Sequence, residues 1–365
     1  MLLARRNLAH DPVRLALSVA GVAVSIALIL LLVGYRAGVY AQASAYLDHA
    51  PGDYVVAGPG TAGFLGTTSA LDSEIEDRVA AIPGVARVVP LITQFVVFEQ
   101  HGRKDGFFLV GYDPALGGGP WLLTAGREPR TDGELVLDET TARQHGITLG
   151  DTIRILDRDE AVVGLSGETT FWAGSIGFAR LGTLESLLRA GDLRSFLLVS
   201  LAPGSGAADV RAAVAGLRAD LVPKATLIAN DRRLLARVYD APIGLMVIIA
   251  FAVGVLVVGL VIYTAAIERR REYGALKAIG APNRVLYRIV VAQALLAAVS
   301  GSLAGAGLAL GGSVLLTAWR PQFRVEIDAA TLAVVIASSL VMAVAAALAP
   351  ARSLAALEPA EVFRG

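Results

Sequence analysis

The sequence predicts a membrane protein with four transmembrane α-helices and an extracytoplasmic α+β domain between the first two helices. Two observations give this fold class. Of the 365 residues, 55% are hydrophobic and the mean hydropathy is +0.61, whereas soluble domains contain roughly 45–50% apolar residues even when glycine is counted. The hydrophobic residues also gather in four long runs without a charged side chain, while one long stretch between the first two runs is polar.

The four apolar runs cover residues 15–35, 241–267, 289–318 and 329–349. A helix that crosses a bilayer needs about 20 consecutive apolar residues, whereas a buried apolar stretch in a soluble protein is commonly about 10–14 residues long. We therefore interpret each run as a membrane span. The first run also exceeds the ~7–15 apolar residues of a signal-peptide core, so it is expected to remain as a helix in the mature protein.

The distribution of charge predicts the orientation, because Lys and Arg accumulate in short cytoplasmic flanks. The N-terminal flank 1–14, the loop 268–288 and the tail 350–365 together carry 11 basic and 5 acidic residues, a net charge of +6. The segment 36–240 carries 19 basic and 25 acidic residues, a net charge of −6. We therefore expect a multi-pass protein of the bacterial cytoplasmic membrane with both termini in the cytoplasm and a short outer loop at 319–328.

The outer segment alternates short apolar runs with helical patterns, which is typical of an α+β domain. The predicted strands cover Asp53–Ala57, Arg87–Glu99 with a break at Pro90, Phe107–Val110, Leu135–Leu137, Thr152–Leu156, Phe196–Leu201 and Thr226–Ala229, and the predicted helices cover Asp72–Ala81, Thr183–Arg189 and Ala207–Leu221. Strand, helix and strand thus occur near 53–98 and again near 196–229. We expect these two βαβ-like parts to pack beside each other, with residues of roughly 100–192 as an inserted subdomain.

Several catalytic and cofactor classes are excluded by motif. None of the three lysines follows a glycine, so a Walker P-loop is missing, and none of the four histidines precedes a glutamate, so a His-Glu-x-x-His zinc helix is missing. There is no cysteine for a disulfide or a thiolate ligand. The string from Gly58 to Gly63 fits the dinucleotide fingerprint, but the residues after it do not begin a helix. His49, just outside the first span, is either a metal or haem ligand or a solvated histidine.

The informative segment follows the second span. It reads Glu268-Arg269-Arg270-Arg271-Glu272-Tyr273-Gly274-Ala275-Leu276-Lys277-Ala278-Ile279-Gly280, followed by Ala281-Pro282. Tyr273, Leu276 and Ile279 predict a short apolar helix face, Gly280 and Pro282 predict its end, and Asn283 can cap the next helix. The arginines alone would suit an anchor on lipid headgroups, but an apolar face with a defined end favours a helix that docks into a groove of a partner.

This segment resembles the cytoplasmic loop of ABC-transporter permeases of the FtsX/MacB type, in which an Arg-rich stretch precedes Gly/Ala-Leu-Lys/Arg-Ala-Ile/Leu-Gly-Ala. The tail Pro350–Glu361 and the outer stretches Gly133–Glu139 and Gly150–Ile153 are similar to other parts of that family. The family's topology is also the one predicted here: one membrane helix, a large outer domain and three further membrane helices. This chain has Gln293 where several relatives carry an acidic residue early in the third span.

The resemblance implies a permease subunit without catalytic residues or cofactors of its own. ATP and Mg would bind a separate cytoplasmic ABC ATPase, which would contact Glu268–Gly280. That ATPase would drive export or mechanical work on the outer domain, called mechanotransmission. The further partners implied are a second copy or a paralogous permease, membrane lipid and an extracytoplasmic adaptor, with no nucleic acid. The substrate, whether peptide, lipoprotein, lipid, haem or drug, is not readable.

The third span contains two small-xxx-small pairs, Gly301 with Gly305 and Gly307 with Gly311. Such pairs allow close approach between membrane helices, so all four glycines are predicted packing positions. The alternative function is a membrane-anchored sensor or structural protein whose outer domain binds a ligand. A secondary carrier is disfavoured, because the four spans contain no ionisable residue of the kind that lines ion pathways.

Overall fold

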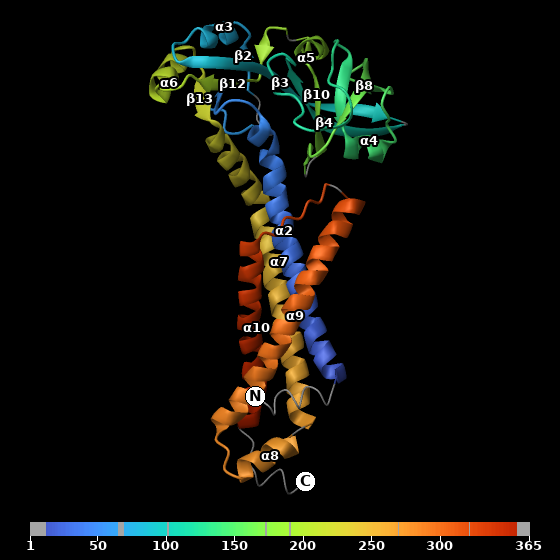
Figure 1. Ribbon diagram of the computed structural model, residues 1–365, viewed down its shortest axis with the longest axis vertical. Coiled ribbons are helices and arrows are strands. Elements are labelled where there is room, and N and C mark those ends of the chain that lie inside the picture. Colours follow the sequence, from blue (N-terminus) through green and yellow to red (C-terminus); the bar gives the residue numbers. More distant parts are fainter. Residues whose placement is uncertain are drawn as a thin grey trace. The chain divides into compact units, whose positions relative to one another are not determined.

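The computed structural model describes residues 12–64, 69–100, 102–171, 174–189, 191–268, 270–320 and 322–355 (Figure 1). These residues form two compact units. Among the described residues, a helical unit contains 12–38, 239–320 and 324–355, and a β-rich unit contains 39–238 with Gln322 and Phe323. The division falls inside two long helices, α2 (Pro12–His49) and α7 (Lys224–Glu268).

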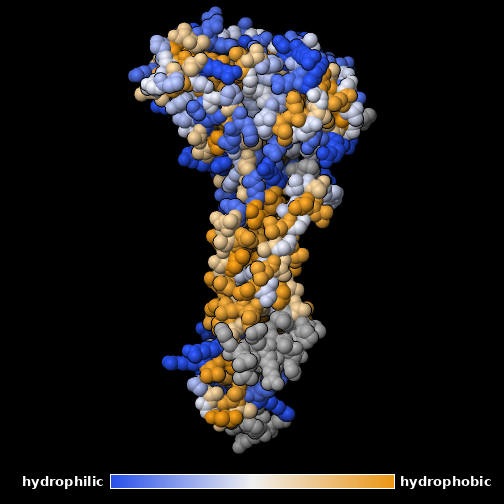
Figure 2. Space-filling model, in the orientation of Figure 1, coloured by the Kyte–Doolittle hydropathy of each residue, from blue (hydrophilic) through white to orange (hydrophobic). Residues whose placement is uncertain are grey.

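The four predicted membrane spans are confirmed as helices. Besides α2 and α7 they are α9 (Asn283–Trp319) and α10 (Ala329–Ala355), and all four are long and apolar enough to cross a bilayer. Figure 2 shows hydrophobic residues covering the visible surface of these helices. Leu256, Leu303 and Val314 are examples of large apolar side chains that are about 70% exposed, which is the surface that lipid chains cover.

Closely packed side chains from several helices hold the helical unit together. Val22 and Ile26 of α2, Ala294 and Ala298 of α9, and Met342 of α10 belong to one buried cluster. Ser302 of α9 donates a buried hydrogen bond of 2.7 Å to the hydroxyl of Ser339 in α10. Lipid exerts no hydrophobic force between helices, so such close packing and interhelical hydrogen bonds are what stabilise the bundle.

The strands and short helices of the β-rich unit lie between α2 and α7 in the chain. Its strands are β1 (Tyr54–Ala57), β2 (Leu71–Asp72), β3 (Val85–Gln100), β4 (Arg103–Tyr112), β5 (Leu123–Gly126), β6 (Glu134–Asp138), β7 (Thr152–Ile155), β8 (Arg158–Ser166), β9 (Thr170–Phe171), β10 (Gly174–Arg180), β11 (Leu193–Arg194), β12 (Phe196–Leu201) and β13 (Asp220–Pro223), and its short helices are α3 (Ile75–Ala80), α4 (Glu139–His145), α5 (Leu181–Leu188) and α6 (Ala207–Gly216).

Two strand–helix–strand segments, β1-α3-β3 and β12-α6-β13, interleave in one antiparallel sheet. Its order is β13-β1-β12-β3, which is the split β-α-β arrangement. Strand side chains alternate between two faces. Val56 therefore packs with α3 and α6 in one cluster, while Val55 and Ala57 belong to a second cluster on the other face. The last strand was predicted too late in the chain: residues 226–229 lie in helix α7, and the strand is Asp220–Pro223.

The chain between β3 and β12 forms the rest of the larger sheet, in the order β3-β4-β10-β6-β8-β5. Strand β3 joins the two parts, because its residues 85–91 pair with β12 and its residues 92–100 pair with β4. The expected break at Pro90 is absent, and β3 is continuous. Proline is tolerated where a strand is paired on one side only, and β4 begins to pair only at Ile92.

Candidate functional site

The fingerprint-like loop Gly58–Gly63 is occupied by the protein's own acceptors. The amide of Gly58 donates to the hydroxyl of Ser69, and that of Gly60 donates to the Asp220 carboxylate at 3.0 Å. The amide of Phe64 donates to both carboxylate oxygens of buried Asp231 in α7 at 3.1–3.2 Å. Backbone amides that already bind carboxylates offer nothing to a phosphate, and the negative charges would repel it. The dinucleotide interpretation is therefore unsupported.

His49, the other open candidate, is engaged at the end of α2. Its Nδ1 lies 2.8 Å from the carbonyl oxygen of Ala45, and its ring stacks on Trp121 with the centroids 4.8 Å apart. In the described part of the chain, no three His, Cys, Asp or Glu side chains form a group that could hold a metal ion. The contacts of His49 are those of a residue that fixes the helix end.

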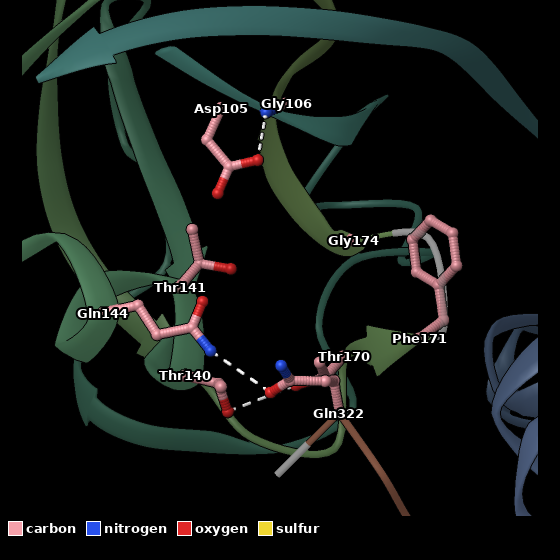
Figure 3. A pocket seen from close by; sticks show the side chains of 9 residues that line it. All are labelled: Asp105, Gly106, Thr140, Thr141, Gln144, Thr170, Phe171, Gly174 and Gln322. Atoms are coloured by element: carbon pink, nitrogen blue, oxygen red, sulfur yellow. Dashed lines mark hydrogen bonds between the residues drawn. The ribbon is translucent and has the colours of Figure 1, made fainter. Parts of the chain in front are cut away.

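A polar pocket of about 190 Å³ lies in the β-rich unit beside α4 (Figure 3). Asp105 and Thr141 point into it, while Gln144 donates to the side chain of Gln322 at 3.2 Å and Thr170 donates to Thr140 at 3.2 Å. The carboxylate of Asp105 also lies 2.8 Å from the Nε2 of His145. The polar side chains of the pocket thus have hydrogen-bond partners within the protein. The lining residues show no arrangement of a nucleophile beside a base.

Glu160 on β8 is a buried carboxyl group whose Oε2 has no hydrogen-bond partner among the described residues. Burial raises its pKa, and the nearby charge of Arg158 opposes this only in part. The native state therefore holds the proton more tightly than the unfolded chain, where Glu titrates near ~4.3. The stability that the protonated group contributes is present below that pH and is lost as the pH rises through the raised native pKa.

We expect Glu160→Gln to flatten this pH dependence, because the amide stays neutral. The measurement is the thermal unfolding midpoint of the detergent-purified chain between pH 4 and 8. The wild type should lose stability relative to Glu160→Gln as the pH rises, and Glu168→Gln, at an exposed position, should follow the wild type. Parallel curves for wild type and Glu160→Gln would contradict the expectation.

The segment singled out by its motif forms a short helix, α8 (Arg270–Ala278), between α7 and α9. Its end is closed as predicted. Gly280 has a φ of +96°, the amide of Gly280 bonds the carbonyl of Lys277 at 2.9 Å, and the amide of Ala281 bonds that of Leu276 at 3.0 Å. This is the Schellman pattern, which favours glycine at the left-handed position. Helix α9 then begins with Pro282, not Asn283, as its N-cap.

The three apolar residues of the segment do not all face the bundle. Tyr273 is 4% exposed and lies in the buried cluster of the helical unit, and Leu276 packs against that cluster. Ile279, in contrast, is 86% exposed. The helix repeat of 3.6 residues explains this difference, because positions six apart are separated by about 120° around the axis. The predicted single apolar face is therefore wrong: two of its members fix α8 to the bundle and only Ile279 faces outward.

The other residues of the segment divide in the same way. Gly274 is buried and Ala275 is half-buried, whereas Glu268, Arg271, Glu272 and Ala278 are exposed. Lys277 is half-buried and donates to the carbonyl of Ala355 in α10 at 2.7 Å. Arg269 lies outside the described residues. The outward surface of α8 is thus one large aliphatic side chain with charged neighbours, which we call the α8 tip: Arg271, Glu272, Ala278, Ile279 and Gly280.

The four predicted packing glycines of α9 fall into two pairs with different surroundings. A Cβ at Gly301 would lie 2.5 Å from Val22 Cβ, and one at Gly305 would lie 2.6 Å from the carbonyl oxygen of Ala23, both in α2. A Cβ at Gly307 or Gly311 would meet nothing within 4 Å. Gly301 and Gly305 are therefore the contact that brings α9 against α2.

Four membrane helices with a β-rich domain between the first two define a class of membrane subunit, and the comparisons with known proteins identify it. Residues 15–217 match the MacB-like periplasmic core domain, and residues 244–359 match the FtsX-like permease C-terminal domain. The chain belongs to the FtsX/MacB-like family of ABC transporter permeases. It is accordingly a multi-pass protein of the inner membrane, and its family works with a partner ABC ATPase.

Several known proteins are similar to this chain. Two uncharacterized ABC transporter permeases of Mycobacterium tuberculosis (strain ATCC 25618 / H37Rv) are each 27% identical, over 355 and 360 residues, and each match covers 96% of both chains. Among solved structures, the periplasmic region of MacB from Actinobacillus actinomycetemcomitans is 13% identical, covers 49% of this chain and 91% of that one, and has a TM-score of 0.39. The extracellular domain of the transporter YknZ from Gram-positive bacteria is 14% identical, covers 44% and 87%, and has a TM-score of 0.34.

Proposed function

We propose that this permease couples ATP hydrolysis by a separate cytoplasmic ABC ATPase to export, or to mechanical work on its β-rich domain, and that the α8 tip is the contact with the ATPase. The observation that carries the proposal is the exposure of Ile279. A large aliphatic side chain that is 86% exposed beside a rigidly closed helix end is suited to fill an apolar pocket of a partner, as the central anchors of protein interfaces do.

The remainder of α8 supports the same role. Tyr273 and Leu276 bind the helix to the bundle, so a force on the tip is resisted by packed side chains. Helix α8 also follows α7, a helix of 45 residues from Lys224 to Glu268 that contains Pro242. A long helix transmits displacement along its axis. Helix α7 therefore offers a path from α8 to strand β13, which immediately precedes α7 in the chain.

The orientation that this requires agrees with the charges. The arginine-rich segment around α8 would face the cytoplasm with both termini, and the acidic segment 36–240 would lie outside, as the positive-inside rule favours. Because an ABC ATPase would act as a pair, we propose that two permeases assemble, either two copies of this chain or one copy with a paralogue. Lipid and an extracytoplasmic adaptor are further proposed partners.

Ile279→Asp is expected to weaken binding of the ATPase subunit. Loss of an interface anchor typically costs 2 kcal/mol or more, and a buried charge adds to this, so roughly 30-fold weaker binding is expected. The measurement is co-purification with a co-expressed ABC ATPase subunit, followed by titration in detergent. Leu149→Asp, at an exposed apolar position of the β-rich unit, is the matched control and should bind as the wild type does. Unchanged binding by Ile279→Asp would exclude the α8 tip as the contact.

A further inference from the structure

The end of α10 is attached to α8 by a side chain that the proposed ATPase contact does not use. The ammonium group of Lys277 donates to the carbonyl oxygen of Ala355 at 2.7 Å, in a partly buried position. Carbonyl groups near the C-terminus of a helix carry partial negative charge, so a lysine there is bound by charge as well as by the hydrogen bond. Tyr273 of α8 and Ala351 of α10 belong to the same buried cluster.

The attached part of α10 follows a proline. Pro350 lies inside α10 and has no N–H, so it cannot bond the carbonyl of Ala346 one turn earlier. Gly259 of α7 lies against that carbonyl, where a Cβ would be 3.3 Å from the oxygen. Residues Ala351–Ala355 are therefore joined to the rest of α10 by one hydrogen bond fewer than an unbroken helix provides, and helices bend at such points.

The opposite end of α10 is also attached. The segment just before it, Arg324–Ile327, which we call the strap, lies on α2 where two glycines leave room. The amide of Glu326 donates to the carbonyl of Gly34 at 2.9 Å, and a Cβ on Gly34 would come within 3.0 Å of Ile327. At Gly38 an added Cβ would collide with the backbone carbonyl of Arg324. A displacement of α10 along its axis would therefore pull on a segment seated on α2.

We propose that Lys277 is a positioning residue that couples α8 to the end of α10, so that α10 moves with α8 and forms a second mechanical route, beside α7, that ends at the strap on α2. This rests on the proposed function, since α8 must be the element that the ATPase moves. In this arrangement α7 receives the displacement through the chain itself. Helix α10 receives it through one charge-assisted hydrogen bond and the packing around Ala351.

The chain contains no cysteine, so two introduced cysteines can carry spin labels without labelling at any other position. Labels at Ala275→Cys in α8, a half-buried position outside the α8 tip, and at Arg352→Cys in α10, an exposed position, leave the proposed ATPase contact unmodified. In the full-length permease alone, the label-to-label distance distribution should be narrow with Lys277, should lose its narrow peak in Lys277→Met, and should regain it in Lys277→Arg, which restores a charged donor. An unchanged distribution in Lys277→Met, with the fold intact by circular dichroism, would overturn the proposal.

The same label pair distinguishes this inference from the proposed function. With the ATPase bound, ATP should leave the distance unchanged in the wild type, because α8 and α10 move together, and should change it in Lys277→Met. A wild-type distance that changes with ATP as much as in Lys277→Met would overturn the coupling. If the ATPase does not bind at all, the proposed function fails, while the measurement on the permease alone still decides whether Lys277 holds the two helices together.

Discussion

Replacing Gly305 by Leu is expected to separate α9 from α2 and to unfold or misassemble the helical unit. The obstacle is the main-chain carbonyl of Ala23, which lies 2.6 Å from where a Cβ would be and cannot rotate away as a side chain can. Overpacking costs typically 1–3 kcal/mol and more where the neighbour cannot yield, so we expect a loss of about 3 kcal/mol or more. The measurement is the thermal unfolding midpoint, with the yield of monodisperse protein in detergent.

The control for this prediction is in the same helix. Gly307→Leu introduces the same side chain two residues later, where a Cβ meets nothing within 4 Å, and its surface position predicts a change within about 0.5 kcal/mol. Equal loss of stability in both variants would show that helix propensity or insertion decides the outcome, and would contradict the assignment of Gly305 to the contact with α2.

Tyr46→Ala is the second prediction with a large effect, because Tyr46 joins α2 to the core of the β-rich unit. Its ring is 2% exposed, stacks on Phe64 with the centroids 5.1 Å apart, and lies against Trp121 and Phe178. Its hydroxyl donates to the carbonyl of Gly118 at 2.8 Å. Removing a buried aromatic ring costs roughly 3–5 kcal/mol, and this cavity would also leave the Gly118 carbonyl without its donor.

The measurement for Tyr46 is thermal unfolding followed by tryptophan fluorescence, since Trp121 borders the site. Tyr46→Phe separates the two contributions. It keeps the ring and removes the hydrogen bond, so a loss of about 1 kcal/mol is expected. If Tyr46→Ala were no less stable than Tyr46→Phe, the aromatic cluster would not be what holds α2 to this unit.

The four membrane helices could be predicted from the sequence because their signal is local. An uninterrupted apolar run of about 20 residues has few alternatives to a helix in lipid. The turn that ends α8 at Gly280 could be predicted for the same reason, because it depends on residues that are consecutive in the chain. The strands were harder. Strand β10 (Gly174–Arg180) contains two glycines and is mostly buried, so it lacks the alternation that reveals a strand with one wet face. Thr226–Ala229 has strand-forming residues but lies in α7, because propensity yields to the packing of Leu227 in the core.

The sequence by itself determined the family, the four membrane helices and the position of the segment proposed to meet the ATPase, since each depends on composition or on residues that are neighbours in the chain. The tertiary structure decided which side chains of that segment face outward. Tyr273, Leu276 and Ile279 are all apolar in the sequence. In the structure Tyr273 and Leu276 pack inward, whereas Ile279 is 86% exposed. It likewise separated Gly301 and Gly305 from Gly307 and Gly311, because a helix face has a neighbour only when a distant part of the chain is placed against it.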